Sequence, residues 1–241
     1  MNAMNENTTL LKLIAMVCMI IDHLGAALFP GLLWMRVIGR IAFPLFCWCL
    51  AVGAHYTRNI YMYGARLFVL YIVSQPFYNG ALSHTWASPN IFMTLLLGLI
   101  GIAGIQRKWY WLTIAAIIFS MYTGADYGLR GVVCILLLYA LRKHPIALSA
   151  AFALFCVEWG VSWSHIVRTP WANIALSWGP ASRGMFKIAD KMVTLQTLAV
   201  MSLPLMLIPA RKRTKLPVPD KLLYWVYPAH LAVIWGIKAL M

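Results

Sequence analysis

The stretch KLIAMVCMIIDHLGAALFPGLLWMRVIGRIAFPLF, residues 12–46, decides the class of fold. It is apolar almost throughout, yet it holds five ionisable side chains, which are Lys12, Asp22, His23, Arg36 and Arg40. Ionisable groups inside a long apolar run cost free energy in a lipid bilayer and usually mark a pathway or a site. We therefore interpret the rest of the chain as a scaffold around this stretch.

The composition is that of an integral membrane protein. Of the 241 residues, 62% are hydrophobic and 11% are charged, whereas soluble domains carry about 25% charged residues. The apolar runs are long and continuous, which predicts membrane-spanning helices. The formal net charge of +14 comes mostly from basic residues between these runs. That placement favours a role in membrane topology over nucleic-acid binding.

The cysteines give no indication of a metal site. Their number is odd, all five lie inside apolar runs, and they lack the spacing of metal ligands. We expect them to pack in the interior and expect no metal.

We predict a single domain, residues 1–241, that is an all-α polytopic bundle of about nine transmembrane helices. The predicted spans are 10–29, 32–53, 65–82, 90–105, 109–123, 129–141, 145–163, 192–208 and 222–240. The loops after the second, fourth, sixth and eighth spans are basic, which places them and the N-terminus in the cytoplasm and the C-terminus outside. The connection 164–191 is amphipathic, and we expect it to lie in the membrane interface.

The depth of each polar group follows from this topology. Lys12 lies at the cytoplasmic end of the first helix, and His23 lies roughly 16 Å further out. Eleven residues make almost whole turns, so both side chains share one stripe of the helix. Asp22 points about 100° away from His23 and need not touch it.

The second helix brings two arginines to the same depth as His23. Arg36 and Arg40 are four residues apart and share one face. Asp126 maps to the outer mouth, and His230 maps near the middle of the last helix. Two interpretations remain open: buried salt bridges such as Asp22–Arg40, or a site whose histidines transfer protons. Lys12 and Arg36 have alternatives too, which are a topological role for Lys12 and a surface position for Arg36.

Five short segments carry a family resemblance. They are Ile21-Asp22-His23, Gly39 to Phe46, Asn90 to Thr94, Asp126-Tyr127-Gly128 with Gly131, and Tyr227 to Leu231. In these segments, which follow one order over nearly the whole chain, the sequence resembles the TraX family of integral membrane acetyltransferases, which includes the F-pilin acetylase. Lys12 and His23 are also similar to the basic-x10-His signature of the wider transmembrane acyltransferases.

The resemblance implies transfer of an acetyl group from cytoplasmic acetyl-CoA to an acceptor at or beyond the membrane. His23 is then the expected general base, and His230 is a second candidate for that role. Asp22 or Asp126 would orient the site, and Arg40 would stabilise the oxyanion of the thioester or order a carboxylate.

The resemblance also implies a path for the donor. Lys12, with Arg36 and Arg66 as further cations, would bind the CoA moiety. The distance from Lys12 to His23 is of the order of the reach of the pantetheine arm. The expected acceptor is the N-terminal amine of a conjugative pilin, and the expected location is the bacterial inner membrane, with many passes.

Two other functions remain open at this stage. One is O-acetylation of a cell-surface glycan by the same chemistry. The other is a non-catalytic scaffold or a transporter of a conjugation system. The chain lacks the internal repeats and paired broken helices that are frequent in transporters, and a scaffold has no need for two histidines at one depth. We therefore expect an acetyl-CoA-dependent N-acetyltransferase whose partners are acetyl-CoA, a pilin or another membrane-associated acceptor, and the lipid bilayer, without nucleic acid.

Overall fold

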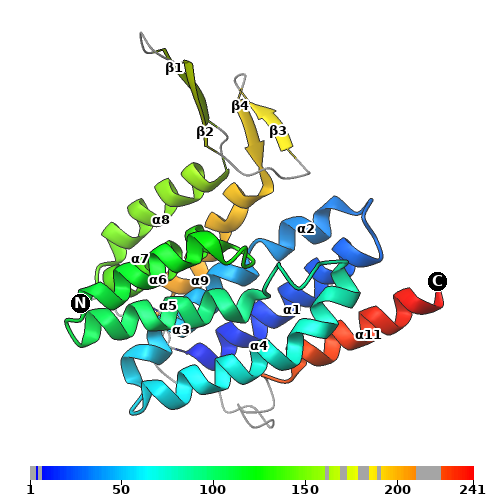
Figure 1. Cartoon of the computed structure of the whole chain (residues 1–241), viewed down its shortest axis with the longest axis horizontal. Coiled ribbons are helices and arrows are strands. Elements are labelled where there is room, and N and C mark those ends of the chain that lie inside the picture. The colour runs from blue at the N-terminus through cyan, green and yellow to red at the C-terminus, as the bar shows by residue number, and fades with distance from the viewer. Residues whose placement is uncertain are drawn as a thin grey trace.

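The computed structural model describes Met4 and residues 7–160, 163–168, 173–178, 185–188, 191–209 and 224–241 (Figure 1). Helices form most of it. They are α1 Thr8–Ala27, α2 Leu33–Gly39, α3 Ala42–Tyr56, α4 Ile60–Leu82, α5 Ile91–Gln106, α6 Tyr110–Tyr122, α7 Gly128–Leu141, α8 Pro145–Gly160, the 3-10 helix η1 Leu195–Ser202, α9 Leu203–Leu207 and α11 Val226–Leu240. The basic run 211–215, predicted to be cytoplasmic, lies outside the described residues.

The predicted helical bundle is confirmed, but one region departs from an all-α fold. The connection expected to lie as an amphipathic segment in the interface instead contains two antiparallel hairpins, β1 Trp163–Arg168 with β2 Asn173–Trp178 and β3 Met185–Ile188 with β4 Lys191–Thr194. Both hairpins project from the same side of the helices (Figure 1). Prolines at positions 170 and 180, and the β-branched residues Ile166, Val167 and Ile174 in the strands, disfavour a helix and favour strands.

The second predicted span is broken into α2 and α3. Between them, Arg40 N–H donates to the Val37 carbonyl at 3.1 Å, and Ile41 N–H donates to the Ile38 carbonyl at 3.1 Å. These are the bonds of a tight 3-10 turn. Pro44 explains the break, because in a continuous helix its ring would clash with the Arg40 carbonyl and its missing N–H would leave that carbonyl without a bond.

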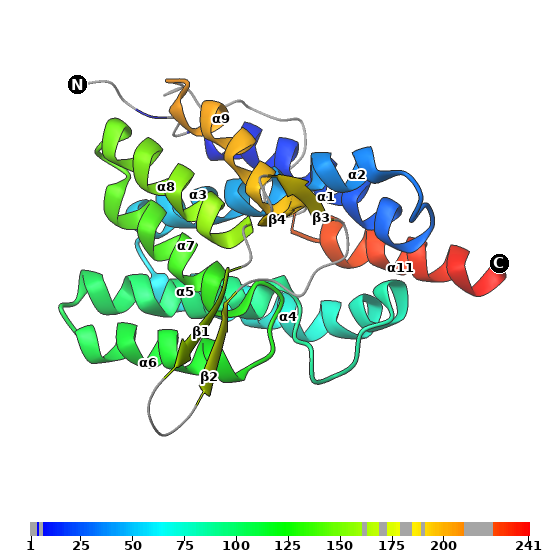
Figure 2. The ribbon, with the colours of Figure 1, turned by 90° about the horizontal axis from the view of Figure 1, so that it is seen from above.

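The helix α3 is the centre of the bundle. It packs against α1, α5 and α7, and its side chains Phe43, Leu45 and Trp48 are almost fully buried. Around it, α1 also packs against α2 and α11, α4 packs against α5 and α11, and α8 packs against α7 and η1. In the view from above, α11 and α2 flank α1 on the side of the C-terminus (Figure 2). This packing brings the last helix beside the first.

The connections alternate between the two ends of the bundle. At one end, Gln106 Nε2 donates to the Ala54 carbonyl at 2.9 Å and an Arg142 nitrogen lies 3.2 Å from His55 Nδ1. At the other end, Asp126 N–H donates to the Pro89 carbonyl at 2.9 Å and Lys238 Nζ donates to Ser83 Oγ at 2.6 Å. The first end gathers the connections after α3, α5 and α7, which hold Arg58, Arg107, Lys108, Arg142 and Lys143, and we call it the basic end.

Two stretches are long and apolar enough to cross a membrane, Thr8–Ala27 and Leu33–Tyr56. The other apolar helices of the described part are shorter, 10–17 residues, or more polar. Many large apolar side chains are nevertheless exposed on the outside of the bundle, among them Val69 and Ile72 on α4 and Trp111 and Ile118 on α6.

Candidate functional site

Two half-buried histidines from opposite ends of the chain meet where α11 packs against α1. Nδ1 of His23, on α1, lies 2.7 Å from Nε2 of His230, on α11. Nδ1 of His230 lies 2.9 Å from the carbonyl oxygen of Val226, one turn earlier on the same helix. The sequence predicts that both histidines lie at a similar depth. Because α11 packs on α1, the two side chains are also in contact.

The two imidazole rings lie edge to edge rather than face to face. Their planes differ by 11° and their centroids are 5.0 Å apart. Each ring nitrogen lies just over an ångström from its ring centre, so a nitrogen–nitrogen distance of 2.7 Å places both nitrogens on the line between the centroids. The contact is therefore an in-plane hydrogen bond with good alignment. The ring of Tyr227 packs edge-on against both imidazoles.

An ion-pair cluster lies next to this pair. The Asp22 carboxylate accepts two bonds from Arg40 Nη2, at 2.9 and 3.2 Å. Arg36 Nη1 lies 2.8 Å from Asp22 Oδ2 and donates to the Asp22 carbonyl at 2.9 Å. The Asp22–Arg40 pair considered from the sequence is thus present, and the Asp22 carboxylate faces the arginines rather than His23.

Three further contacts hold this cluster in place. Arg40 Nε donates to the Arg36 carbonyl at 3.1 Å, and Arg40 Nη1 donates to Gln196 Oε1, on η1, at 2.9 Å. A side chain at Gly39 would overlap the Asp22 carboxylate, so only glycine permits the close approach of α2 to α1. Gln196 was missed from the sequence, although an amide side chain inside an apolar segment was a signal for it.

A small cavity, about 20 Å³, lies between His23 and the carboxylates of Asp22 and Asp126. Asp22, His23, Asp126 and Tyr127 line it together with Tyr227 and apolar residues of α1 and α3. It therefore brings together most of the residues that were predicted to be catalytic, and His230 joins them through its bond to His23.

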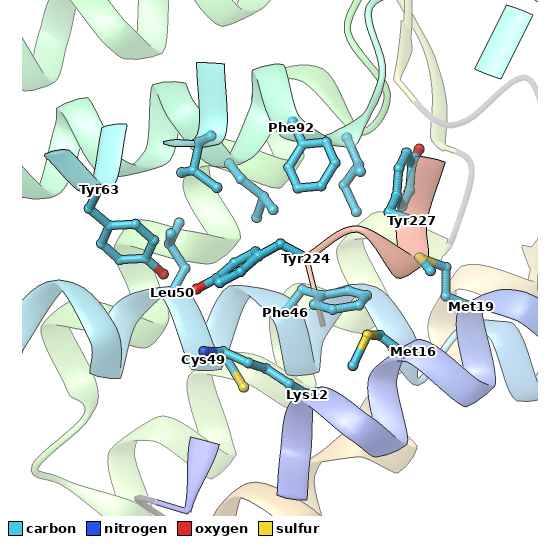
Figure 3. Close-up of a pocket in the computed structure, with 13 residues that line it drawn as sticks. Lys12, Met16, Met19, Phe46, Cys49, Leu50, Tyr63, Phe92, Tyr224 and Tyr227 are labelled. Carbon is cyan, nitrogen blue, oxygen red and sulfur yellow. The ribbon is translucent and has the colours of Figure 1, made fainter. Parts of the chain in front are cut away.

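A larger cavity, about 70 Å³, adjoins it and reaches Lys12. Both cavities share the lining residues Met19, Phe46, Ile91 and Tyr227. Figure 3 shows Lys12, Met16 and Met19 along one wall, with Phe92 on the opposite wall and Tyr224 between them. The lining is apolar apart from the Lys12 ammonium group, tyrosine hydroxyls and the Cys49 thiol.

The stripe predicted for α1 runs along both cavities. Lys12, Met16 and Met19 line the larger cavity, and Met19 and His23 line the smaller one. Spacings of four, three and four residues keep these side chains on one face of a helix. The ammonium group of Lys12 lies 5.4 Å from the ring centre of Tyr224, a cation–π contact.

The loop between α6 and α7 supplies Asp126 and Tyr127. Tyr127 has a φ of 66°, a conformation that bulky residues rarely adopt. Its ring stacks on Phe43 with centroids 3.7 Å apart, and Thr94 donates a hydrogen bond to the Asp126 carbonyl. These contacts hold the strained loop so that Asp126 lines the smaller cavity.

The Asp126 carboxyl group has a pKa above the ordinary carboxylate range. Burial raises its pKa to about 6, although the nearby Arg40 acts in the opposite direction. Within the described part of the chain, no cation forms an ion pair with it. Asp126 is thus a carboxyl group that changes charge close to neutral pH beside His23.

The substitution Asp126→Asn tests this environment through stability. With a raised pKa in the fold, the unfolded chain ionises first, so the native protein loses stability as pH rises from the ordinary carboxylate range to about 6. We expect the variant to be more stable than the parent above about pH 6, by on the order of 3 kcal/mol. Below the ordinary carboxylate range the gain disappears. Melting temperatures of the variant and the parent in detergent, above pH 6 and below the ordinary carboxylate range, measure this difference in stability. An equal gain in both pH ranges contradicts the prediction.

Several polar residues lie apart from the cavities. Arg66 is exposed on α4 and lines neither cavity, although it is near Tyr63, which lines the larger one. Glu158 lies 3.5 Å from Arg130. Gln75 and Asn90 bond to each other and to neighbouring backbone groups, which fastens α4 to the start of α5.

The fold and the site define a class: a bundle of apolar helices whose interior holds a histidine pair, an aspartate–arginine cluster and two adjoining cavities. The family model described as TraX protein matches residues 7–238. The chain therefore belongs to the TraX family.

Individual relatives agree with this assignment. The chain is 25% identical to "Protein TraX" of Escherichia coli over 238 residues, which cover 96% of this chain and 86% of that protein. It is 38% identical over 89 residues to an uncharacterised protein of Rickettsia prowazekii, covering 37% of this chain and 34% of the relative. It is 34% identical over 73 residues to "Probable fimbrial assembly protein FimC, serogroup H1" of Dichelobacter nodosus, covering 29% and 30%. The matches to the last two thus span about a third of those relatives. No solved structure matches at a significant level.

Proposed function

We propose that this protein is a polytopic acetyltransferase of the bacterial inner membrane, which moves an acetyl group from cytoplasmic acetyl-CoA to the N-terminal amine of a pilin. The observation that carries the proposal is the pair of adjoining cavities, which lead from Lys12 to His23 along one face of α1. Such a path suits a donor with an anionic head and a narrow arm. It also ends at a group able to accept a proton.

The distribution of charge supports a membrane position. Among the described helices, the basic connections after α3, α5 and α7 gather at one end of the bundle. Lys12 and Tyr63, which line the larger cavity, lie toward the same end. By the positive-inside rule this end faces the cytoplasm. The exposed apolar side chains on α4 and α6 suit contact with lipid. Acetyl-CoA would then enter from the cytoplasm, with its phosphates near Lys12.

The proposed reaction is a direct acyl transfer. His23 takes a proton from the acceptor nitrogen as that nitrogen forms a bond to the carbonyl carbon of the thioester. The carbonyl oxygen carries the negative charge until the carbon–sulfur bond breaks. The cation proposed to stabilise it is Arg40, which is paired with Asp22 at the edge of the smaller cavity. The departing CoA thiolate receives the proton held by His23. The products are the acetylated acceptor, free CoA and a neutral His23.

The name of one relative supports an acceptor that belongs to a surface fibre. That relative is called a probable fimbrial assembly protein. A pilin at the outer half of the membrane would meet the smaller cavity, which lies at the end of the bundle opposite the basic connections. The amine of a pilin N-terminus is also a better nucleophile than a glycan hydroxyl once it has lost its proton.

Lys12→Gln tests the donor path. Because a single charge–phosphate contact is worth on the order of 1.4 kcal/mol, we expect the KM for acetyl-CoA to rise about tenfold, with kcat nearly unchanged. The assay measures release of free CoA thiol by purified protein with pilin present. Lys143→Gln is the matched control, since Lys143 is an exposed lysine of the basic end that lines neither cavity. Equal effects of the two substitutions contradict a specific role of Lys12.

The same assay separates the alternative functions. Release of CoA with a glycan acceptor but not with pilin supports O-acetylation. Failure of a folded preparation to bind acetyl-CoA supports a scaffold or transporter.

A further inference from the structure

The two histidines differ in their position relative to the cavities. His230 does not line either cavity, yet it bonds to the ring that does. Its other nitrogen is held by the Val226 carbonyl. Because His230 contacts the proposed base His23 but not the cavity, any effect of His230 on the reaction must act through His23.

The hydrogen-bond chain determines where the protons are. A carbonyl oxygen only accepts, so Nδ1 of His230 carries a proton and donates it to Val226. In a neutral imidazole the other nitrogen is then an acceptor, which makes Nε2 of His230 the acceptor of the bond to His23. Nδ1 of His23 must therefore donate. The Nε2 atom of a neutral His23 is left with a free lone pair, and no partner occupies it among the described residues.

We propose that His230 is a positioning residue that fixes the tautomer of His23, and that Nε2 of His23 is the atom that takes the proton from the acceptor. This inference rests on the proposed acetyl transfer and adds the identity of the basic atom. It also divides the roles of two histidines that the sequence left interchangeable: His23 is the base, and His230 orients it.

The arrangement also stabilises the charged state that follows proton capture. When Nε2 of His23 gains the acceptor proton, the ring becomes an imidazolium and its Nδ1–H bond to His230 becomes charge-assisted, which strengthens it. No proton needs to leave the pair during this step. The proton later departs from the same Nε2 to the CoA thiolate, and the pair returns to its starting state.

Two amide substitutions separate this role from simple packing. In His230→Gln, the side-chain oxygen reaches the place of Nε2 and accepts from His23 Nδ1. In His230→Asn, the shorter amide reaches the Val226 carbonyl but not His23. Both variants are polar and uncharged. We expect His230→Gln to keep kcat within about tenfold of the parent and His230→Asn to lose on the order of 100-fold, with the KM for acetyl-CoA unchanged in both.

Nitrogen NMR of labelled histidine gives a readout independent of turnover. In the parent and in His230→Gln, the unprotonated nitrogen of neutral His23 is expected to be Nε2. In His230→Asn, that preference is expected to weaken. Equal loss in both variants, no loss in either, or an unprotonated Nδ1 in the parent protein would overturn the assignment. If His23→Ala is inactive while His230→Asn is fully active, only the role of His230 fails; if His23→Ala is also fully active, the proposed function of the site fails.

Discussion

Replacing His23 by alanine is expected to lower kcat for acetyl transfer by about a thousandfold, within the usual range for removal of a general base. The side chain that accepts the proton is lost, while the cavity from Lys12 to Met19 remains, so binding of acetyl-CoA is expected to change little. Release of CoA thiol in the presence of pilin measures the rate, and binding of acetyl-CoA measures the integrity of the donor cavity.

His144→Ala is the matched control for this substitution. His144 is exposed and lies outside both cavities, at the start of α8. We expect its replacement to leave the rate unchanged. Full transfer by His23→Ala would contradict the role of His23 as the base, and an equal loss in both variants would point to a general effect on folding.

The second large effect is expected in stability, from Asp22→Asn. The Asp22 carboxylate forms ion pairs with Arg36 and Arg40, whose side chains are 31% and 13% exposed. Removing the negative charge leaves two cations close together in the interior, and breaking a buried pair in this way costs about 3 kcal/mol or more. We expect a clearly lower melting temperature in detergent.

Glu158→Gln provides the comparison on the same scale. Its pair with Arg130 is longer, 3.5 Å, and the Glu158 side chain is 41% exposed. Exposed ion pairs contribute about 0–1 kcal/mol, so this variant is expected to melt close to the parent. If both variants melt at the same temperature, the Asp22 cluster does not stabilise the fold as the geometry indicates.

The stripe on α1 was predictable because a helix has one well-defined period. Lys12 and His23 are eleven residues apart, and the observed cavities follow that face. The Asp22–Arg40 pair was also foreseen, although only as one of two interpretations, since depth alone does not say which charges touch. The bond between His23 and His230 joins residues 207 positions apart, and it depends on the packing of α11 against α1.

The misses have local causes. The break between α2 and α3 interrupts an apolar run without any change in hydropathy, and only Pro44 marked it. Hairpins follow α8 where the sequence predicts an amphipathic interfacial segment, because a short stretch of mixed apolar and polar residues fits both the helical and the strand period. His230 lies in the second turn of α11 rather than near its middle, since the helix begins at Val226 instead of Leu222.

The mass of the pilin N-terminus, in cells with and without this protein, tests the central claim most directly. We predict that the mature pilin is heavier by one acetyl group when the parent protein is present, and that this addition is lost when the protein is absent or carries His23→Ala. An unmodified N-terminus in the presence of the parent protein, or an acetylated one in its absence, would contradict acetyl transfer to pilin by this site.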